Sequence, residues 1–416
     1  MAHPHRKKKT LQLDGFVNIQ KGLGTSKDAQ GRSRYARTRI FTNTELSTLY
    51  STNWLANSVV DVPVEDSLRN WREITSNNAE EIEKEEKRLN LRKSFEMAEK
   101  WAKVFGGAAI VIISDDDTLD KPFNINALSI GGVKRLVVLD RYNLVSDAPN
   151  TNILSDRYGE SEYYTVARGG EKVHYTRVVR FDGEESTIEE RTRNNYWGNS
   201  IYEKLYAPIE NSQSSTQLIN GLLYESNIDV YKIKGLNQLV ANGQDALVVK
   251  RIQMAHDLKS TVNGVVLDAE DDFVKKGNTF AGLADIDDKM IQKVSGASHI
   301  PVTKLLGIAP SGLNSTGESD LRNYYDNLST IQESKYSPKL KFFDDLMTMS
   351  VFGKVQEVDY EWASLWQKSD KEAADTRLVN AQTDNIYLNN GVLEDDEVRS
   401  TLKDYYELNN VAETEE

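Results

Sequence analysis

The sequence contains no cysteine, and only five of its 416 residues are histidines. Without cysteine there can be no disulfide framework, thiolate metal site or cysteine nucleophile, which is consistent with a reducing compartment. Long hydrophobic runs are also missing: the longest, residues 106–113 (GGAAIVII), is too short to cross a bilayer and predicts a buried strand. The G-x-x-x-x-G-K-[ST] phosphate loop is absent, so the chain is not itself an ATP-driven motor of that type.

Acidic residues outnumber basic ones, 64 to 51, and the formal net charge is −13. A surface of this kind repels phosphates and is poorly suited to gripping a nucleic-acid backbone over a wide area. The same repulsion would keep DNA from sticking to a wall past which it slides. With 39% apolar residues, the chain can bury a sizeable core spread over two or three domains.

The first part of the chain predicts a polar arm followed by helices. Residues 1–45 are polar, carry the basic cluster RKKK at 6–9 and lack the apolar stretch of a secretory signal. Apolar residues at helical spacing then predict one helix over residues 46–60 and another after Pro63. Residues 77–107 place apolar stripes beneath a heavily charged face, which is typical of solvated amphipathic helices.

Four short β-rich runs follow, separated by Gly, Asp and Asn turn signals. They are GGAAIVIIS (106–114), GGVKRLVVLDRYNLV (131–145), SEYYTVARG (161–169) and EKVHYTRVVRFDG (171–183). Together they predict an α+β domain with a mixed or antiparallel sheet. A long helix over about residues 201–227 comes next, and then a small α/β insertion, with strands at 229–235 and 264–272 around a helix at 246–258.

The last third of the chain again predicts helices. One helix opens at Asp285, which would cap it, and stops before Pro301. A segment rich in Gly, Ser and Asn then leads into a helix from about Asp320, which Pro338 bends or breaks. The run SDKE at 369–372 has the capping-box pattern of another helix start. The spacing after Asp320 puts five residues on one helical face: Leu321, Tyr324, Tyr325, Leu328 and Ile331.

Few residues could carry catalysis. His174 and Thr176 form an H-x-T element on a predicted strand, the kind that two-histidine phosphoesterases use in pairs. A second H-x-[ST] is absent, because His256 and His299 stand in H-D-L and H-I-P. The acidic runs do not match the calcium-loop pattern and are typical of turns and helix N-termini. A nucleotide phosphoesterase built on His174 and Thr176 therefore stays as an alternative, and no metal or cofactor is expected.

Three stretches of the chain, in this order, resemble the portal proteins of tailed bacteriophages: NNYWGNSIYEKLYAPIENS (194–212), NGVVLDAEDD (263–272) and DKMIQKVSGASHIPVTKLLGIAPSGLNSTGESDLRNYYDNLSTIQE (288–333). The resemblance covers residues 46–402 and is most specific over 296–333, where the run GESDLRNYYD is similar to one branch of the family. The first forty or so residues and the last dozen lie outside the resemblance.

The resemblance implies a subunit with wing, stem, clip and crown regions. The expected regions are a flexible N-terminal arm (1–45), an α+β wing (46–200), stem helix 1 (201–227), a small α/β clip (228–284), stem helix 2 (285–306), a tunnel loop (307–319), a long kinked tunnel helix (320–350), a return to the wing (351–368), a small helical crown (369–410) and a disordered tail (411–416). The expected fold class is α+β, in a portal-like arrangement.

The resemblance further implies a homo-oligomeric ring, typically dodecameric, at one capsid vertex. Double-stranded DNA would be packaged and ejected through its channel. The large terminase, the major capsid protein, the scaffold and the head-to-tail adaptor would be its partners. The expected location is the virion, after assembly in the host cytoplasm, with no catalysis, cofactor or membrane contact. A tail or baseplate ring is a further alternative, against which the Gly/Ser/Asn segment beside two stem-like helices argues.

The resemblance also suggests where the site residues lie. The expected channel-facing residues of the tunnel loop are Ile308, Ala309, Pro310, Ser311, Gly312, Leu313, Asn314, Ser315, Thr316, Gly317 and Glu318. The residues expected to pack the tunnel helix or neighbouring subunits are Leu321, Tyr324, Tyr325 and Leu328. Because the loop carries no Lys or Arg, its contact with DNA should be steric and weak. The basic candidates for contact with DNA, terminase or adaptor lie elsewhere: Lys232, Lys234, Lys250, Arg251 and Lys304.

Overall fold

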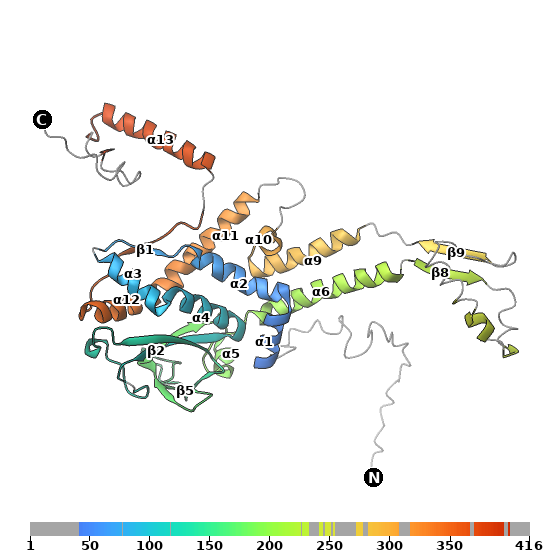
Figure 1. Cartoon of the computed structure of the whole chain (residues 1–416), viewed down its shortest axis with the longest axis horizontal. Coiled ribbons are helices and arrows are strands. Elements are labelled where there is room, and N and C mark those ends of the chain that lie inside the picture. Colours follow the sequence, from blue (N-terminus) through green and yellow to red (C-terminus); the bar gives the residue numbers. More distant parts are fainter. Residues whose placement is uncertain are drawn as a thin grey trace, which may run out of the picture.

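The computed structural model of the chain describes residues 41–394, 398 and 399, apart from 77, 117, 226, 233–240, 244, 245, 251, 252, 254–271, 278–281, 308–316 and 367–369. The described elements form a body of helices and small sheets, from which two long helices project side by side (Figure 1). A two-stranded sheet lies at the far end of that projection. Helices and strands share the chain, which confirms the predicted α+β class. The predicted arm (1–45) lies outside the described residues up to residue 40, and a helix begins at Asn43 within its last part.

The N-terminal helices of the body are α1 (Asn43–Thr52) and α2 (Trp54–Arg69). Asn53 caps α2, because its side-chain oxygen accepts from the backbone N–H groups of the next turn at 3.0 and 3.1 Å. The predicted break at Pro63 is wrong, since Pro63 lies inside α2. Val59, Val60 and Val64 are all buried around it, and this packing holds the helix together across the missing backbone donor.

Helices α3 (Ala79–Leu89) and α4 (Leu91–Phe105) follow, joined by Asn90 in the left-handed conformation (φ 52°). α4 carries the centre of the body's core. The ring of its Phe95 makes edge-on contacts with Trp71, Phe181 and Phe343, with centroids 5.7, 5.2 and 5.4 Å apart. Residues from three other parts of the chain therefore meet on one ring of α4.

Two antiparallel three-stranded sheets follow from the predicted β-rich runs. In the first, β2 (Gly107–Ser114) lies between β3 (Val133–Asp140) and β7 (Val178–Asp182), with Val111 opposite both Val137 and Val178. The second has the order β4 (Leu144–Ser146), β5 (Tyr163–Val166), β6 (Lys172–His174). The short helices of this part are η1 (Ile125–Ala127), η2 (Tyr175–Arg177) and α5 (Ile188–Arg193). All these pairings are antiparallel, one of the two arrangements that the sequence predicted.

The projection consists of α6 (Tyr202–Glu225) and α9 (Leu283–Ser298), capped at its far end by the antiparallel pair β8 (Asn227–Lys232) and β9 (Asp272–Gly277) (Figure 1). α6 confirms the predicted long helix. Asp285 is not the N-cap of α9, because the helix begins earlier, after Gly282 (φ 88°), and Asp285 is in its first turn. The strand predicted at 264–272 lies almost entirely outside the described residues, and β9 had not been predicted.

The chain returns to the body through α10 (Val302–Leu306) and a long helix in three parts: α11 (Glu318–Ile331), η3 (Gln332–Tyr336) and α12 (Ser337–Phe352). η3 is a π-helical turn, and Pro338 stands in the first turn of α12. The predicted bend near Pro338 is thus accompanied by a change of helix type just before it. Strand β10 (Tyr360–Trp362) pairs with β1 (Arg72–Ile74), and α13 (Asp370–Asn389) is the last labelled helix.

A buried ion cluster fastens α12 to the start of the body. Arg72 of β1 donates to Glu86 Oε1 of α3 at 2.7 and 3.0 Å and to Asp344 Oδ2 of α12 at 2.8 Å. All three side chains are buried. Such a cluster is costly to break, because removal of one member leaves the other charges buried without a counter-charge.

Candidate functional site

Residues 308–316 of the predicted tunnel loop (307–319) lie outside the described residues, while its last two residues, 318 and 319, belong to helix α11. Both flanks of 308–316 are described. α10 ends at Gly307 (φ 65°), and α11 begins after Gly317 (φ 54°). Both glycines are in the left-handed region, where a side chain would be strained, so each fixes the direction in which the chain leaves its helix. The site that can be described is therefore the frame on either side of residues 308–316.

The two flanks meet at one carboxylate of α2. Asp66 Oδ2 lies 2.9 Å from Lys304 Nζ of α10, and the hydroxyl of Tyr324 in α11 donates to the same oxygen at 3.2 Å. Arg69 Nη1 lies 3.6 Å from Asp66 Oδ1. We call Asp66, Arg69, Lys304, Tyr324 and Tyr325 the Asp66 cluster.

Electrostatics favours the charged form of Lys304 and the neutral form of Tyr324. Burial alone would lower the pKa of Lys304, but hydrogen bonding with Tyr325 and with Asp66 and the attraction of the carboxylate outweigh it and raise that pKa. Burial and the neighbouring Asp66 carboxylate raise the pKa of Tyr324. Lys304 therefore stays charged and the Tyr324 hydroxyl stays a donor. Lys304, predicted as a candidate for DNA contact, is thus paired with a carboxylate of its own chain.

Aromatic and guanidinium groups pack beside the Lys304–Asp66 ion pair. The ring of Tyr325 has Lys304 Nζ 5.3 Å and Arg69 Cζ 5.6 Å from its centroid. Tyr325 also makes an edge-on contact with Trp366, with centroids 6.1 Å apart. These cation–π and ring contacts shield the ion pair from water, which strengthens it relative to a pair on an open surface.

Most of the predicted apolar face of the helix after residue 317 lies in the core of its own subunit. Tyr324 and Leu328 are buried in the same core cluster as Leu205 of α6 and Val294 of α9, and Tyr325 and Ile331 pack against it half-buried. Leu321 is also partly buried. Tyr324, Tyr325, Leu328 and Ile331 thus pack within their own subunit. Their contact with a neighbouring subunit stays a prediction.

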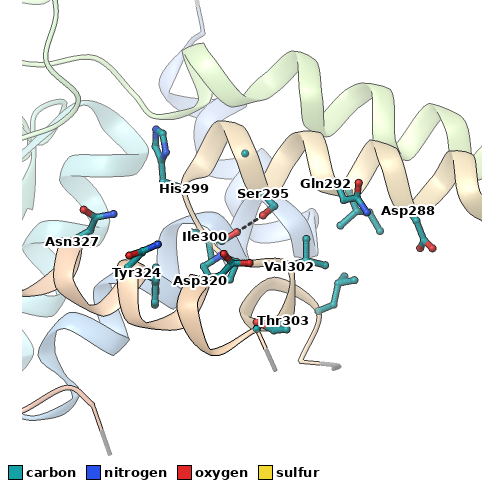
Figure 2. A pocket seen from close by; sticks show the side chains of 16 residues that line it. Asp288, Gln292, Ser295, His299, Ile300, Val302, Thr303, Asp320, Tyr324 and Asn327 are labelled. Carbon is teal, nitrogen blue, oxygen red and sulfur yellow. Dashed lines mark hydrogen bonds between the residues drawn. The ribbon is translucent and has the colours of Figure 1, made fainter. Parts of the chain in front are cut away.

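A groove beside the cluster lies between α9, α10 and α11 (Figure 2). Its volume is about 460 Å³, and its walls mix apolar side chains of α9 and α10 with the polar groups Asp288, Gln292, Asp320, Asn323 and Asn327. Within its wall, the Ser295 hydroxyl donates to the carbonyl of Ile300 at 2.6 Å (Figure 2). The groove offers hydrogen-bond acceptors and donors, of the kind that binding sites use to orient a ligand.

The other predicted basic contacts are only partly described. The backbone of Lys232 ends β8, and Lys250 is exposed in a short helical stretch at 246–250. Lys234 and Arg251 lie outside the described residues. Lys232 and Lys250 therefore belong to the far part of the projection, away from the Asp66 cluster (Figure 1).

His174 and Thr176 are engaged with each other in the second sheet. His174 Nδ1 lies 2.8 Å from Thr176 Oγ1 and also accepts from the Thr176 backbone N–H at 3.4 Å, while Thr176 Oγ1 accepts from the Phe123 N–H at 2.6 Å. Burial and the nearby Arg157 and Arg177 lower the pKa of His174, against the opposite effect of Glu162. His299 ends α9 in the projection, and His256 lies outside the described residues. This geometry gives His174 a structural place and no second imidazole partner in the described part of the chain.

Two other features are absent from the described residues. They contain no group of three or more His, Cys, Asp or Glu side chains placed to hold a metal ion. Among the same residues, no helix is long and apolar enough to cross a membrane.

Comparison with known proteins points to one family. The family described as phage portal protein matches residues 44–386. A protein of Caulobacter sp. (strain RHG1) named anti-CBASS protein Acb1 is 31% identical over 390 residues, which are 89% of this chain and 62% of that protein. An uncharacterized protein of Haemophilus influenzae (strain ATCC 51907 / DSM 11121 / KW20 / Rd) is 29% identical over 404 residues, 94% of this chain and 90% of that protein.

A solved structure shares the fold. A chain from the neck of a native gene transfer agent (GTA) particle, computed with C12 symmetry, has a TM-score of 0.51 at 13% identity. The match covers 88% of this chain and 96% of that chain. At this identity the likeness shows the fold alone. The chain spans less than two thirds of the Caulobacter relative, so more than a third of that protein has no counterpart here.

Proposed function

The chain belongs to the phage portal protein family, which matches residues 44–386, and we propose that it is the subunit of a homo-oligomeric portal ring. The observation that carries the proposal is the extent of the match. It includes the body, both helices of the projection, the Asp66 cluster and the α11–η3–α12 helix, rather than a single motif. The role is structural rather than enzymatic: the ring surrounds a channel for double-stranded DNA at one capsid vertex.

The described elements take their roles in the ring from this proposal. We assign α6 and α9 to the stem, β8 and β9 with the residues between them to the clip, and α11–η3–α12 to the tunnel helix. α13 belongs to the crown, and the body is the wing. The C12 symmetry of the neck with a similar fold supports twelve subunits. A projecting helix pair of this kind can pack against its copies head to tail, and that contact repeats until the ring closes.

Residues 308–316 would face the channel, held by the frame on either side of them. The acidic balance of the chain fits a wall that DNA passes without sticking, as does the lack of Lys and Arg between Ile308 and Gly317. DNA contact in this segment is steric and weak. Lys232, Lys234, Lys250 and Arg251 lie in the proposed clip, where the large terminase and the head-to-tail adaptor would dock. The major capsid protein and scaffold would contact the wing, and the ring would be part of the virion.

The name of the Caulobacter relative is not carried over to this chain, because more than a third of that protein lies outside the match. A nucleotide phosphoesterase on His174 is disfavoured by the pairing of that imidazole with Thr176 and by its burial.

Electron microscopy of the purified protein, with native mass spectrometry on the same sample, tests the proposal. We expect rings whose central channel is wide enough for a DNA duplex, with a mass equal to a whole number of subunits, twelve or a neighbouring number. A monodisperse monomer that stays monomeric at high concentration, and that cannot be incorporated into capsids, would contradict it.

A further inference from the structure

We infer that Asp66 is a positioning residue that fixes both flanks of residues 308–316 to helix α2. The inference deepens the proposed function. Its consequence, that Asp66 sets where the channel-facing segment lies, rests on the proposed function. Its structural part stands on the described contacts alone. One carboxylate accepts from Lys304, four residues before the segment, and from Tyr324, eight residues after it.

The chemistry of the contacts requires a carboxylate. Lys304 Nζ lies 2.9 Å from Oδ2 and 3.2 Å from Oδ1, Tyr324 donates to Oδ2 at 3.2 Å, and Arg69 approaches Oδ1 at 3.6 Å. Every partner is a donor, and an ionised carboxylate is an acceptor at both oxygens. An asparagine in this place would turn an N–H₂ group toward at least one of these donors, and it would leave the Lys304 charge partly buried without a counter-charge.

The first flank depends on this contact because α10 is too short to be stable by itself. It has five residues, whereas isolated helices need roughly 12–15 residues to be even marginally stable in water. Within α10, Leu305 is buried in the core and Lys304 is bound to Asp66. These contacts, together with the approach of Lys304 to the Tyr325 ring and the partial burial of Val302 and Leu306, hold the end of α10.

The second flank is held by α2 at two successive residues. Asp66 binds Tyr324 in the middle of α11, and the neighbouring Ser67 binds the π-helical turn that follows. The Ser67 carbonyl accepts from Gln332 Nε2 at 2.7 Å, and its hydroxyl lies 3.2 Å from the Tyr336 hydroxyl. α2 therefore supports α11 through both Asp66 and Ser67. Of these two residues, Asp66 also contacts α10, through Lys304.

Hydrogen exchange on the full-length protein, read peptide by peptide by mass spectrometry, tests the inference with Asp66→Asn. We expect exchange to become several-fold faster in both flanks together, in peptides covering 302–307 and 318–325, with exchange in β2 unchanged. Asp61→Asn is the matched control. It removes a carboxylate from the same helix that accepts from Tyr50 at 2.8 Å and pairs with Lys100 at 3.6 Å, and it should leave both flanks as in wild type.

Two single changes keep the inference testable if Asp66→Asn does not fold. Lys304→Met should speed exchange mainly in 302–307, and Tyr324→Phe mainly in 318–325, each less than the loss of Asp66 would. Unchanged exchange in both flanks of a folded Asp66→Asn protein, or a change in one flank only, would overturn the inference.

DNA packaging separates this inference from the proposed function. With Asp66→Asn rings intact, we expect fewer DNA-filled heads than with Asp61→Asn rings. Faster exchange in both flanks combined with normal packaging would support Asp66 as the positioning residue and contradict the channel-facing assignment of 308–316. A wild-type protein that forms no ring would contradict the proposed function and leave the exchange result valid.

Discussion

The body and the projection differ in how they bury apolar side chains. In the body, β2 is covered on both faces, and Phe95 is surrounded by rings from distant parts of the chain. In the projection, the described side chains of α6 that are apolar and buried lie near the body, while farther out Leu218 and Leu222 are 68% and 41% exposed. Thr216 reaches across to Asp287 of α9 at 2.9 Å, a polar contact at an exposed position.

The difference indicates which part of the molecule is complete as a single subunit. The body has its own core and should be stable alone. In the outer half of the projection, Leu218 and Leu222 are exposed. The described residues do not bury them as they bury the apolar side chains of the body. Contiguous exposed apolar residues commonly mark interaction sites. The account therefore predicts that changes in the body act on folding and that changes in the projection act on ring formation.

The largest effect should come from the buried ion cluster of the body. Arg72→Met leaves Glu86 and Asp344 buried without their partner, and we expect the free energy of unfolding to fall by about 3–5 kcal/mol. Urea unfolding followed by circular dichroism measures it. Lys87→Met is the control, because the exposed pair of Lys87 with Glu83 should contribute less than about 0.5 kcal/mol. If Arg72→Met and Lys87→Met lowered the free energy of unfolding equally, the buried cluster would not be what stabilises the body.

A change in the outer projection should act on assembly instead. Leu218→Lys should leave the unfolding free energy of the subunit within about 0.5 kcal/mol of wild type, since the side chain is exposed. Ring yield in native mass spectrometry should drop several-fold. Gln217→Lys adds the same charge at the neighbouring exposed position and serves as the control. If Leu218→Lys gave the same ring yield as the control, the assignment of ring contacts to the projection would be contradicted.

Tyr324 lies where the two regions meet, and a smaller effect is expected there. Tyr324→Phe keeps the ring in the core and removes only the hydrogen bond to Asp66, so unfolding free energy should fall by about 0.5–1.5 kcal/mol. The raised pKa of Lys304 means that its contribution is present below its unfolded pKa and is lost only when strongly alkaline pH passes the folded pKa. Because Lys304 stays charged over this range, the difference in unfolding free energy between Tyr324→Phe and wild type should be the same at pH 6 and pH 8.

The smallest effect concerns His174. Its pKa is lowered by burial, so the neutral form contributes stability above the unfolded pKa of about 6.5, and this contribution is lost as the pH falls through the folded pKa. Unfolding free energies at pH 7.5 and 5.5 should differ more in wild type than in His174→Asn, which cannot titrate. An identical difference in both proteins would show that His174 does not contribute to the pH dependence.

Much of the fold could be predicted because it follows from local spacing. The antiparallel runs around β2, the long helix α6 and the apolar face with Tyr324 and Leu328 were all visible as periodic patterns. The break expected at Pro63 was wrong because tertiary packing of its valine neighbours overrides the local preference. The pairing of β1 with β10 joins residues nearly three hundred positions apart, for which the sequence carries no local signal.

The site was predicted only in outline. The resemblance suggested where the tunnel segment and its packing helix lie, but it did not indicate Asp66, which reads as one of several acids in VPVEDSLRN. Its partners Lys304 and Tyr324 are more than two hundred residues away in sequence. Only the arrangement of α2 against α10 and α11 shows that one carboxylate serves both flanks. One signal in the sequence pointed to Asp66: helical spacing places it on the same side of α2 as buried residues.

A cryo-electron microscopy reconstruction of the purified ring, at a resolution that traces the backbone, tests the central claim most directly. The account predicts a closed ring in which residues 308–316 of every subunit face the channel, with the outer halves of α6 and α9 against those of the next subunit and Leu218 in that contact. A ring whose 308–316 segments lie on its outer surface would contradict the account, as would a protein that forms no ring.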